Sequence, residues 1–281
     1  MKRRLGVHIS ISGGIDKGLE RAKDLGCSTV QLFSHNPRGW VFGKRDPAEI
    51  TRFRTLKKDL DIRPAYIHTS YLINLASSRR QLLNQSVDMI VQEMQIADEI
   101  GAEYVILHTG SASGEDPATA RKRSITALRT VAGQGKWRAG LLLENTAGER
   151  GDITSRISEI AEIMEGVSSD LIAGICLDTC HAFAAGYDIT EEYSIDELAA
   201  EIKTYIGKEG LKLVHLNDSK KPLGSGVDRH EHIGEGAIGR KGLQRFLLHH
   251  FFSDVPLILE TPKNSEEDDK RNIGIVRKLI V

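Results

Sequence analysis

The stretch "RRQLLNQSVDMIVQEMQIADEIGAEYVILH" (79–108) contains the clearest example of a pattern that recurs along the chain and decides the fold. Within residues 79–100, one side carries the apolar residues Leu83, Val87, Ile90, Val91, Met94 and Ala97. Such a stripe is typical of an amphipathic helix, and Gly101 is the type of residue at which a helix ends. The following run "YVILH" (104–108) is apolar up to its final histidine, as in a strand buried on both faces of a parallel sheet. The stretch therefore predicts a helix followed by a buried strand.

The same kind of run recurs along the whole chain. Seven more are present: "GVHIS" (6–10), "TVQLF" (29–33), "AYIH" (65–68), "GLLLE" (140–144), "GICLD" (174–178), "KLVHL" (212–216) and "PLILE" (256–260). Eight strands that alternate with helical segments predict an α/β protein, a single (β/α)8 TIM-barrel domain over residues 1–281. An open, doubly wound sheet is the alternative. It would carry a glycine-rich phosphate-binding turn after its first strand, and "ISISGG" (9–14) matches that turn poorly.

Composition narrows the function classes. The formal net charge of −1 gives no basic surface of the kind that binds nucleic acid, although bound metal ions would add positive charge that the composition does not count. No apolar run approaches the roughly 20 residues that span a bilayer. The three cysteines are too few, and odd in number, for a disulfide framework, which fits a reducing cytoplasm. We expect a cytoplasmic monomer with no membrane association and no obligate protein partner.

Six of the eight runs carry a residue of a metal-binding type at or next to their end: His68, His108, Glu144, Asp178, His215 and Glu260. In a barrel these ends open on one rim, where barrel enzymes place their chemistry. Burying such side chains without partners costs several kcal/mol, and no comparable set of lysines or arginines stands at the strand ends. The six residues therefore predict cations that are shared among them at the C-terminal rim.

Two loops add three further candidates. His181 follows Asp178 by three residues in "DTCH", and Asp228 and His230 are alternate residues in "VDRHEH" (227–232). One zinc ion takes about four ligands, so five histidines, two aspartates and two glutamates suit two or three ions. A set of imidazoles and carboxylates without cysteine favours zinc, with manganese or iron as alternatives.

Each candidate also has an ordinary structural interpretation. Asp178 alone could cap the following helix, and Asp228 and His230 could lie in a polar surface loop. The joint arrangement favours the metal site, because nine separate structural roles would otherwise coincide on one rim. His8, at the end of the first run, is expected to support the site rather than to bind metal.

Longer motifs resemble those of a known family. The motifs, which follow one another in unbroken order within residues 8 to 262, are "HTSYLINL" (68–75), "LHTGS" (107–111), "LLENTAG" (142–148), "CLDTCHAFAAGYD" (176–188), "VHLNDSK" (214–220), "GSGVDRHEHIGEG" (224–236) and "LILETP" (257–262). They resemble endonuclease IV, the zinc-dependent apurinic/apyrimidinic endonuclease. The resemblance implies a cluster of three zinc ions at the rim of the barrel. Carried over position by position, the ligands are, for the first ion, His68, His108 and Glu144; for the second, Glu144 as a bridge with Asp178, His215 and Glu260; and for the third, His181, Asp228 and His230.

The activity implied by the resemblance is repair of damaged double-stranded DNA. The phosphodiester bond 5′ to an abasic site would be hydrolysed, leaving a 3′-hydroxyl and a 5′-deoxyribose phosphate, with a hydroxide that bridges two metal ions as the nucleophile. Glu144 is expected to be catalytic, since it would bridge the ions and orient the nucleophile. Arg38 in "NPRGW" (36–40) and Tyr71 match family residues that enter DNA at the lesion. Gly39 stands where well-known members carry a larger polar side chain. Fewer side-chain atoms are therefore expected to enter the DNA from the loop that carries Arg38.

The alternative function is a metal-dependent sugar isomerase or epimerase of the xylose-isomerase type. Such an enzyme would need only the carboxylate-rich group Glu144, Asp178, His215 and Glu260. A non-catalytic sensor of DNA lesions would instead predict a degraded set of ligands, and all nine positions carry ligand types. The number of bound metal ions discriminates, because one or two favour the isomerase and three favour the nuclease.

Overall fold

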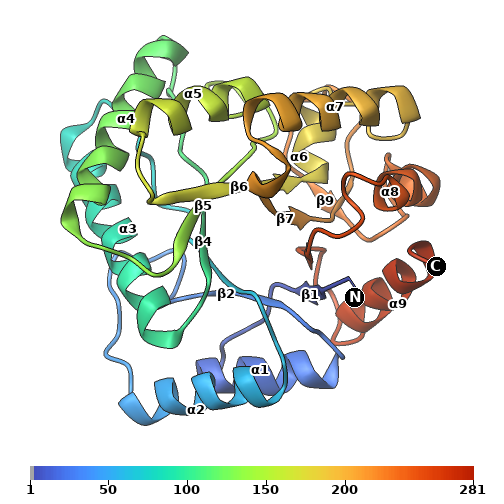
Figure 1. Cartoon of the computed structure of the whole chain (residues 1–281), viewed down its shortest axis with the longest axis horizontal. Coiled ribbons are helices and arrows are strands. Elements are labelled where there is room, and N and C mark those ends of the chain that lie inside the picture. Colours follow the sequence, from blue (N-terminus) through green and yellow to red (C-terminus); the bar gives the residue numbers. More distant parts are fainter. Residues whose placement is uncertain (1–2) are drawn as a thin grey trace.

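The computed structural model describes residues 3–281, and its centre is a sheet of eight parallel strands (Figure 1). The order of the strands in this sheet is β1-β10-β7-β6-β5-β4-β3-β2, so that the first two strands of the chain form its two edges. Their bounds are β1 (Leu5–Val7), β2 (Val30–Phe33), β3 (Ala65–His68), β4 (Tyr104–Leu107), β5 (Gly140–Glu144), β6 (Ile172–Asp178), β7 (Leu211–His215) and β10 (Leu257–Leu259).

The edges β1 and β2 meet and close the sheet into a barrel. His8 forms an isolated parallel bridge with Gln31, and the Ile9 amide donates a hydrogen bond to the Gln31 carbonyl oxygen at 2.7 Å. Gly6 permits this approach, because a Cβ atom there would lie 1.9 Å from the carbonyl oxygen of Thr29. Strand β1 ends earlier than the predicted run 6–10, since only the single bridge at His8 continues the pairing. The predicted TIM barrel is confirmed.

The helices lie outside the strands and connect one strand to the next (Figure 1). Among residues 3–281, no helix is both long and apolar enough to cross a bilayer. The bounds of the helices are α1 (Ile15–Asp24), α2 (Pro47–Asp59), α3 (Arg80–Ile100), α4 (Pro117–Gln134), α5 (Ile157–Val167), α6 (Thr179–Ala184), α7 (Glu192–Tyr205), α8 (Gly239–Leu248) and α9 (Asp268–Leu279).

Local sequence explains where several helices begin and end. Asp46 and Asp116 cap α2 and α4, and each is followed by a proline in the first turn of the helix. The carboxylates accept hydrogen bonds from backbone amides that have no partner within the helix, which stabilises each helix by about 1 kcal/mol. Helix α3 ends at Gly101, whose backbone is left-handed with φ of 73°, as the sequence predicts.

The buried face of α3 differs in part from the predicted stripe. Ile90, Met94 and Ala97 are buried, whereas Leu83, Val87 and Val91 are only partly covered. Neighbouring helices α2 and α4 flank α3 on both sides, so the covered face is wider and shifted. It is completed by residues outside the predicted stripe: Ser86, Met89, Glu93, Ile96 and Ile100.

The inside of the barrel is a separate apolar layer with one buried residue from each of six strands: Tyr66, Ile106, Leu142, Cys176, Leu213 and Ile258. Side chains on a strand alternate between its two faces, so the residue two positions further on points to the same interior. Those residues are His68, His108, Glu144, Asp178, His215 and Glu260. The pleat of the strands therefore brings the six predicted strand-end residues together above the apolar layer.

Candidate metal centre

Glu144 lies at the centre of the polar cluster, fully buried at the end of β5. Its Oε2 atom lies 3.4 Å from His68 Nε2 and 3.1 Å from His108 Nε2. Its Oε1 atom lies 3.0 Å from His215 Nδ1 on the other side. The two oxygens of one carboxylate thus face two different groups of side chains, which is the arrangement of a ligand that bridges two ions.

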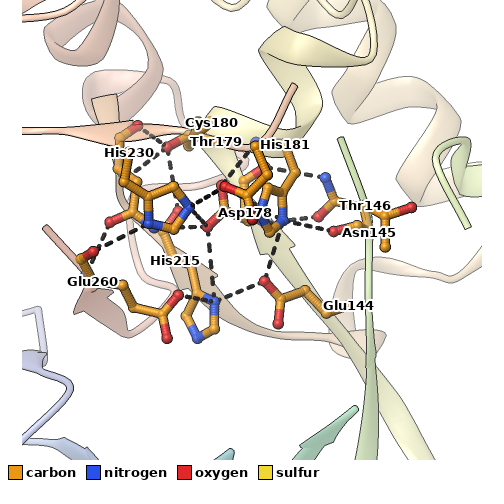
Figure 2. A network of polar contacts seen from close by, with 12 residues as sticks. Glu144, Asn145, Thr146, Asp178, Thr179, Cys180, His181, His215, His230 and Glu260 are labelled. Atoms are coloured by element: carbon orange, nitrogen blue, oxygen red, sulfur yellow. Dashed lines mark hydrogen bonds and ion pairs between the residues drawn. The ribbon is translucent and has the colours of Figure 1, made fainter. Parts of the chain in front are cut away.

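The second group surrounds the Nδ1 atom of His215 at the end of β7 (Figure 2). Besides Glu144, this nitrogen lies 3.3 Å from Glu260 Oε2 and 3.9 Å from Asp178 Oδ2. The four residues each offer one ligand atom within 4.8 Å of the others. Three carboxylates around one imidazole form a site of high negative charge that suits a divalent cation.

The third group is made by His181, Asp228 and His230, which come from two segments. His181 Nε2 lies 3.2 Å from Asp228 Oδ2, and His230 Nε2 lies 3.3 Å from Asp228 Oδ1. Asp178 also approaches this group, with Oδ2 3.6 Å from His230 Nε2. All nine residues singled out in the sequence therefore lie in one contiguous cluster.

A small hairpin brings the loop residues to the barrel rim. Strands β8 (Asp218–Ser219) and β9 (His230–Glu231) pair in antiparallel fashion, so the chain that leaves β7 returns above the barrel. The buried carboxylate of Asp218 accepts hydrogen bonds from the backbone amides of residues 234, 236, 238 and 239. This fixed turn holds His230 over the strand ends.

The separations within the cluster match those expected between ligands of one ion. Two atoms bound at 2.0–2.1 Å to a tetrahedral zinc lie about 3.3 Å apart. Three buried atoms that point into the cluster, Glu144 Oε2, His181 Nε2 and His230 Nε2, have no hydrogen-bond partner among residues 3–281. A buried polar atom without a partner is costly, and cations bound in the first and third groups would satisfy all three.

Three of the histidines are hydrogen-bonded to backbone carbonyls through their outward ring nitrogens, which leaves the inward nitrogen of each to face the cluster. A carbonyl oxygen only accepts, so the ring nitrogen that faces it carries the proton. His68 Nδ1 donates to the Thr69 carbonyl at 2.8 Å, and His181 Nδ1 donates to the Asn145 carbonyl at 2.9 Å. His230 Nδ1 likewise faces the Glu260 carbonyl at 3.1 Å. Nε2 is therefore the ring nitrogen through which each of these histidines can bind a cation in the cluster, as in histidines that bind metal.

The charges of the cluster shift the pKa values of its members. Burial opposes ionisation of Glu144, but the nearby His108 and His215 outweigh it and hold the pKa of this carboxyl well below its usual range. Burial also disfavours the charged form of His181, yet Asp178 and Asp228 raise its pKa well above normal. Burial would raise the pKa of Asp228, whereas His181 lowers it to about 2. Glu144 and Asp228 are therefore ionised at neutral pH and ready to bind cations.

Asp178 occupies both of the roles that the sequence leaves open for it. Its Oδ1 atom accepts from the His181 amide at 2.9 Å and so caps α6. Its Oδ2 atom faces His215 and His230 and accepts from Asn217 Nδ2 at 2.7 Å. The cap orients the carboxylate toward the cluster, and the two roles are compatible.

Three amide side chains that sequence reasoning did not assign support the cluster. Asn145 pairs with the backbone of Asp178 on both sides, with Oδ1 2.7 Å from the amide nitrogen and Nδ2 3.1 Å from the carbonyl oxygen. Asn217 accepts from the Glu260 amide at 2.8 Å. Gln31 contacts His215 and Glu260 directly. Asn145 and Asn217 stand beside predicted ligands in "LLENTAG" and "VHLNDSK", which was the one available signal.

A cavity of about 640 Å³ opens above the cluster and is lined by His68, His108, His181 and other candidate ligands. Tyr71 stands at its edge with 65% of its surface exposed, and its ring packs edge-on against Phe33 at 5.3 Å. The cavity thus combines inward ligand atoms with an exposed aromatic side chain.

Arg38 and His232 lie outside this arrangement. Arg38 is exposed on the loop between β2 and α2 and does not line the cavity, although Ser70 Oγ donates to the Pro37 carbonyl at 2.7 Å and links the two loops. His232 is buried against Asn272, with Nδ1 3.1 Å from Asn272 Nδ2. His8 contacts the cluster from the side, with Nδ1 3.5 Å from Glu260 Oε1, as expected for a supporting residue.

Comparison with known proteins agrees with this fold and shows the family of the chain. Residues 19–279 match the family described as xylose isomerase-like TIM barrels. A probable endonuclease 4 from Halothermothrix orenii is 41% identical over 98% of this chain and 99% of its own. The crystal structure of endonuclease IV from Thermus thermophilus is similar with a TM-score of 0.87 and 36% identity, over 99% of this chain and 98% of that one. A D-tagatose 3-epimerase-like protein has a TM-score of 0.73 at 20% identity, over 99% and 97% of the chains, and shares the fold alone.

The barrel with its cluster of histidines and carboxylates thus defines a xylose isomerase-like TIM-barrel protein. Within that class, the identity of 41% over nearly the whole chain settles the narrower group. The chain belongs to the endonuclease IV family.

Proposed function

We propose that this protein is a zinc-dependent apurinic/apyrimidinic endonuclease that acts as a single-domain monomer on damaged duplex DNA. It hydrolyses the phosphodiester bond 5′ to an abasic site and leaves a 3′-hydroxyl and a 5′-deoxyribose phosphate. The relatives named endonuclease 4 support DNA cleavage. The observation that carries the proposal is the set of three buried, inward-facing ligand atoms without hydrogen-bond partners in the described chain.

The donor set fits three zinc ions, with manganese or iron as alternatives at individual sites. Each of the three groups combines at least one imidazole nitrogen with at least one carboxylate, which is the ligand chemistry of zinc. The assignment that we propose, in order of the three ions, is His68, His108 and Glu144; Glu144, Asp178, His215 and Glu260; and His181, Asp228 and His230.

When bound, such ions lower the pKa of a water molecule toward neutrality and stabilise the oxygen that leaves the phosphorus. The side chains of the protein determine where these ions would be held. Glu144 stays ionised because of its low pKa and presents one oxygen to each of two groups, so it is the residue that aligns the nucleophile. Bound ions would stabilise the leaving oxygen by their charge, so no separate protein acid is assigned to this step.

The rim of the barrel around the cluster is the surface that would bind DNA. Three divalent ions would change the formal net charge from −1 to +5 and concentrate positive charge where the phosphate backbone binds. Tyr71 projects from this rim and would enter the duplex at the lesion, and Arg38, exposed on the loop that the Pro37–Ser70 hydrogen bond ties to it, would contact the DNA beside it. A nucleotide without a base costs less to turn out of the helix, which supplies selectivity for the lesion.

A sugar isomerase would use only the second group of ligands. His68, His108 and His181 would then have no role, although their ring nitrogens also converge on carboxylates of the cluster at 3.1–3.4 Å. The structural similarity to an epimerase-like protein is at the level of the fold. The geometry therefore favours the nuclease.

The test is incubation of the zinc-loaded protein with a duplex that carries one stable abasic analogue, with the undamaged duplex as control. We expect a single cut 5′ to the analogue. Glu144→Gln should reduce the rate by roughly 10³-fold or more, the equivalent of about 4 kcal/mol, while Glu93→Gln, which removes a buried carboxylate elsewhere, should not. Substantial cleavage by Glu144→Gln would exclude the bridging role, and no cleavage by the wild-type protein would exclude the function.

A further inference from the structure

Gln31 is a fully buried amide in β2 that contacts two members of the polar cluster and His8 beside them. Its Oε1 atom lies 2.6 Å from His215 Nε2. Its Nε2 atom lies 2.5 Å from Glu260 Oε1 and 2.8 Å from His8 Nδ1. The side chain therefore links two candidate ligands of the second ion to His8, which follows β1 at the place where β1 and β2 close the barrel.

The hydrogen-bonding groups of Gln31 can be arranged in only one way. Glu260 Oε1 is an acceptor, so the amide NH2 must face it and the amide oxygen must face His215. His215 Nε2 then carries the proton, so Nδ1 is the ring nitrogen left to bind a cation held between Glu144 and Glu260. The second N–H of the amide faces His8 Nδ1 at 2.8 Å, which accepts from it.

We propose that Gln31 is the positioning residue of the second metal site. It selects the tautomer of His215 that can bind a cation through Nδ1, and it holds Glu260 Oε1 so that Oε2 turns inward, 3.3 Å from that nitrogen. This inference rests on the proposed metal centre and deepens it. Partners of this kind around a metal-binding histidine typically change metal affinity by roughly 10–100-fold.

The backbone of the same residue closes the barrel. The Gln31 carbonyl accepts from the Ile9 amide at 2.7 Å, and residue 31 forms the bridge with His8. One residue therefore takes part both in the pairing of β1 with β2 and in the orientation of the ligands of the second ion. A variant must be judged by metal binding rather than by activity alone, because disturbed closure would also lower activity.

The first test compares zinc binding by the wild-type protein and Gln31→Met, which has a similar volume and makes none of the three hydrogen bonds. Competition with a chelator should show one of three zinc ions bound roughly 10–100-fold more weakly in the variant, with the other two unchanged. In the metal-free wild-type protein, the His215 Nε2 proton should give a slowly exchanging imidazole NMR signal, and this signal should be lost in Gln31→Met. Unchanged affinity for all three ions would overturn the inference.

Two further variants keep the test decisive if Gln31→Met is unstable. Gln31→Glu retains the acceptor for His215 but no longer donates to Glu260, so it should keep the His215 signal and still weaken one ion. Thr29→Val removes a buried hydrogen bond to the Pro64 carbonyl just before β2 and touches no candidate ligand. It should lower the melting temperature without changing zinc affinity. If all three variants lose stability alike and none loses zinc affinity, Gln31 is only structural; a wild-type protein that binds no zinc would overturn the metal centre itself.

Discussion

His181 Nε2 and Asp228 Oδ2 lie 3.2 Å apart, although His181 is buried in the first turn of α6 and 45% of the Asp228 side chain is exposed. Forty-six positions separate the two residues, and the hairpin β8–β9 brings them together. This contact ties a surface loop to the barrel rim and completes the third group of candidate ligands.

The third group should be the easiest to dissociate, because Asp228 is its most exposed ligand. Asp228→Asn keeps the shape of the side chain but removes the charge, so we expect two tightly bound zinc ions instead of three and a rate of cleavage lower by roughly 10²-fold or more. Elemental analysis and kinetics on abasic duplex measure both. Asp196→Asn is the matched control, since Asp196 makes a similar pair with His249 at 3.0 Å on the surface. Retention of three ions by Asp228→Asn would contradict the assignment.

Tyr71 should contribute to recognition of the lesion and not to metal binding. Its ring is exposed at the cavity and packs on Phe33 at 5.3 Å, whereas the ring of the nearest candidate ligand, His68, lies 6.3 Å away. Tyr71→Ala should weaken binding to abasic duplex by roughly 10–100-fold, because an aromatic ring stacked on bases contributes about 1–3 kcal/mol. Tyr193→Ala, at an equally exposed tyrosine of α7, should bind normally. Loss of zinc from Tyr71→Ala would show that the residue supports the metal site instead.

Glu93 of α3 should make stability depend on pH. Its Oε2 atom accepts from Ser34, while Oε1 lies 3.4 Å from His35 Nδ1 and has no hydrogen-bond partner in the described chain. His35 Nε2 donates to the Gly39 carbonyl, so Nδ1 of the neutral ring is an acceptor, with Ser34 Oγ at 2.9 Å and Glu93 Oε1 at 3.4 Å. Burial raises the pKa of Glu93 to about 7 from an ordinary value near 4.5. The protonated acid can donate to His35, whereas the carboxylate cannot.

The sign of the effect follows from where the proton is held. Between about pH 4.5 and 7 the folded protein keeps a proton on Glu93 that the unfolded chain loses, so the free energy of unfolding falls as pH rises, by roughly 3 kcal/mol in total. Glu93→Gln supplies a permanent donor. It should raise the melting temperature by roughly 5 °C at pH 8.5 and change it little at pH 4.5. Glu99→Gln, at an exposed position of the same helix, serves as the control, and an effect that is equal at both pH values would refute this account.

Periodicity made the fold and most of the cluster predictable. Eight runs marked the strands, and the strand ends at Glu144 and Asp178 fall where the runs end. Because side chains alternate along a strand, a ligand type two positions after a buried interior residue must reach the same interior. That local rule applies equally to all six strand-end residues and needs no knowledge of distant contacts.

The supporting residues could not be predicted in the same way. Gln31 lies 184 positions from His215 in the chain, and no local pattern distinguishes it from any other polar residue of a strand. The partnership of His35 with Glu93 depends on how α3 packs over the end of β2. The early end of β1 and the wider buried face of α3 likewise result from neighbouring elements, which a pattern within one segment does not contain.

Anomalous diffraction at the zinc absorption edge, from crystals of the protein purified with zinc, tests the central claim most directly. The account predicts three peaks: one among His68, His108 and Glu144, one among Glu144, Asp178, His215 and Glu260, and one among His181, Asp228 and His230. Fewer than three peaks, or peaks away from these residues, in a protein that cleaves abasic duplex at full rate would contradict it.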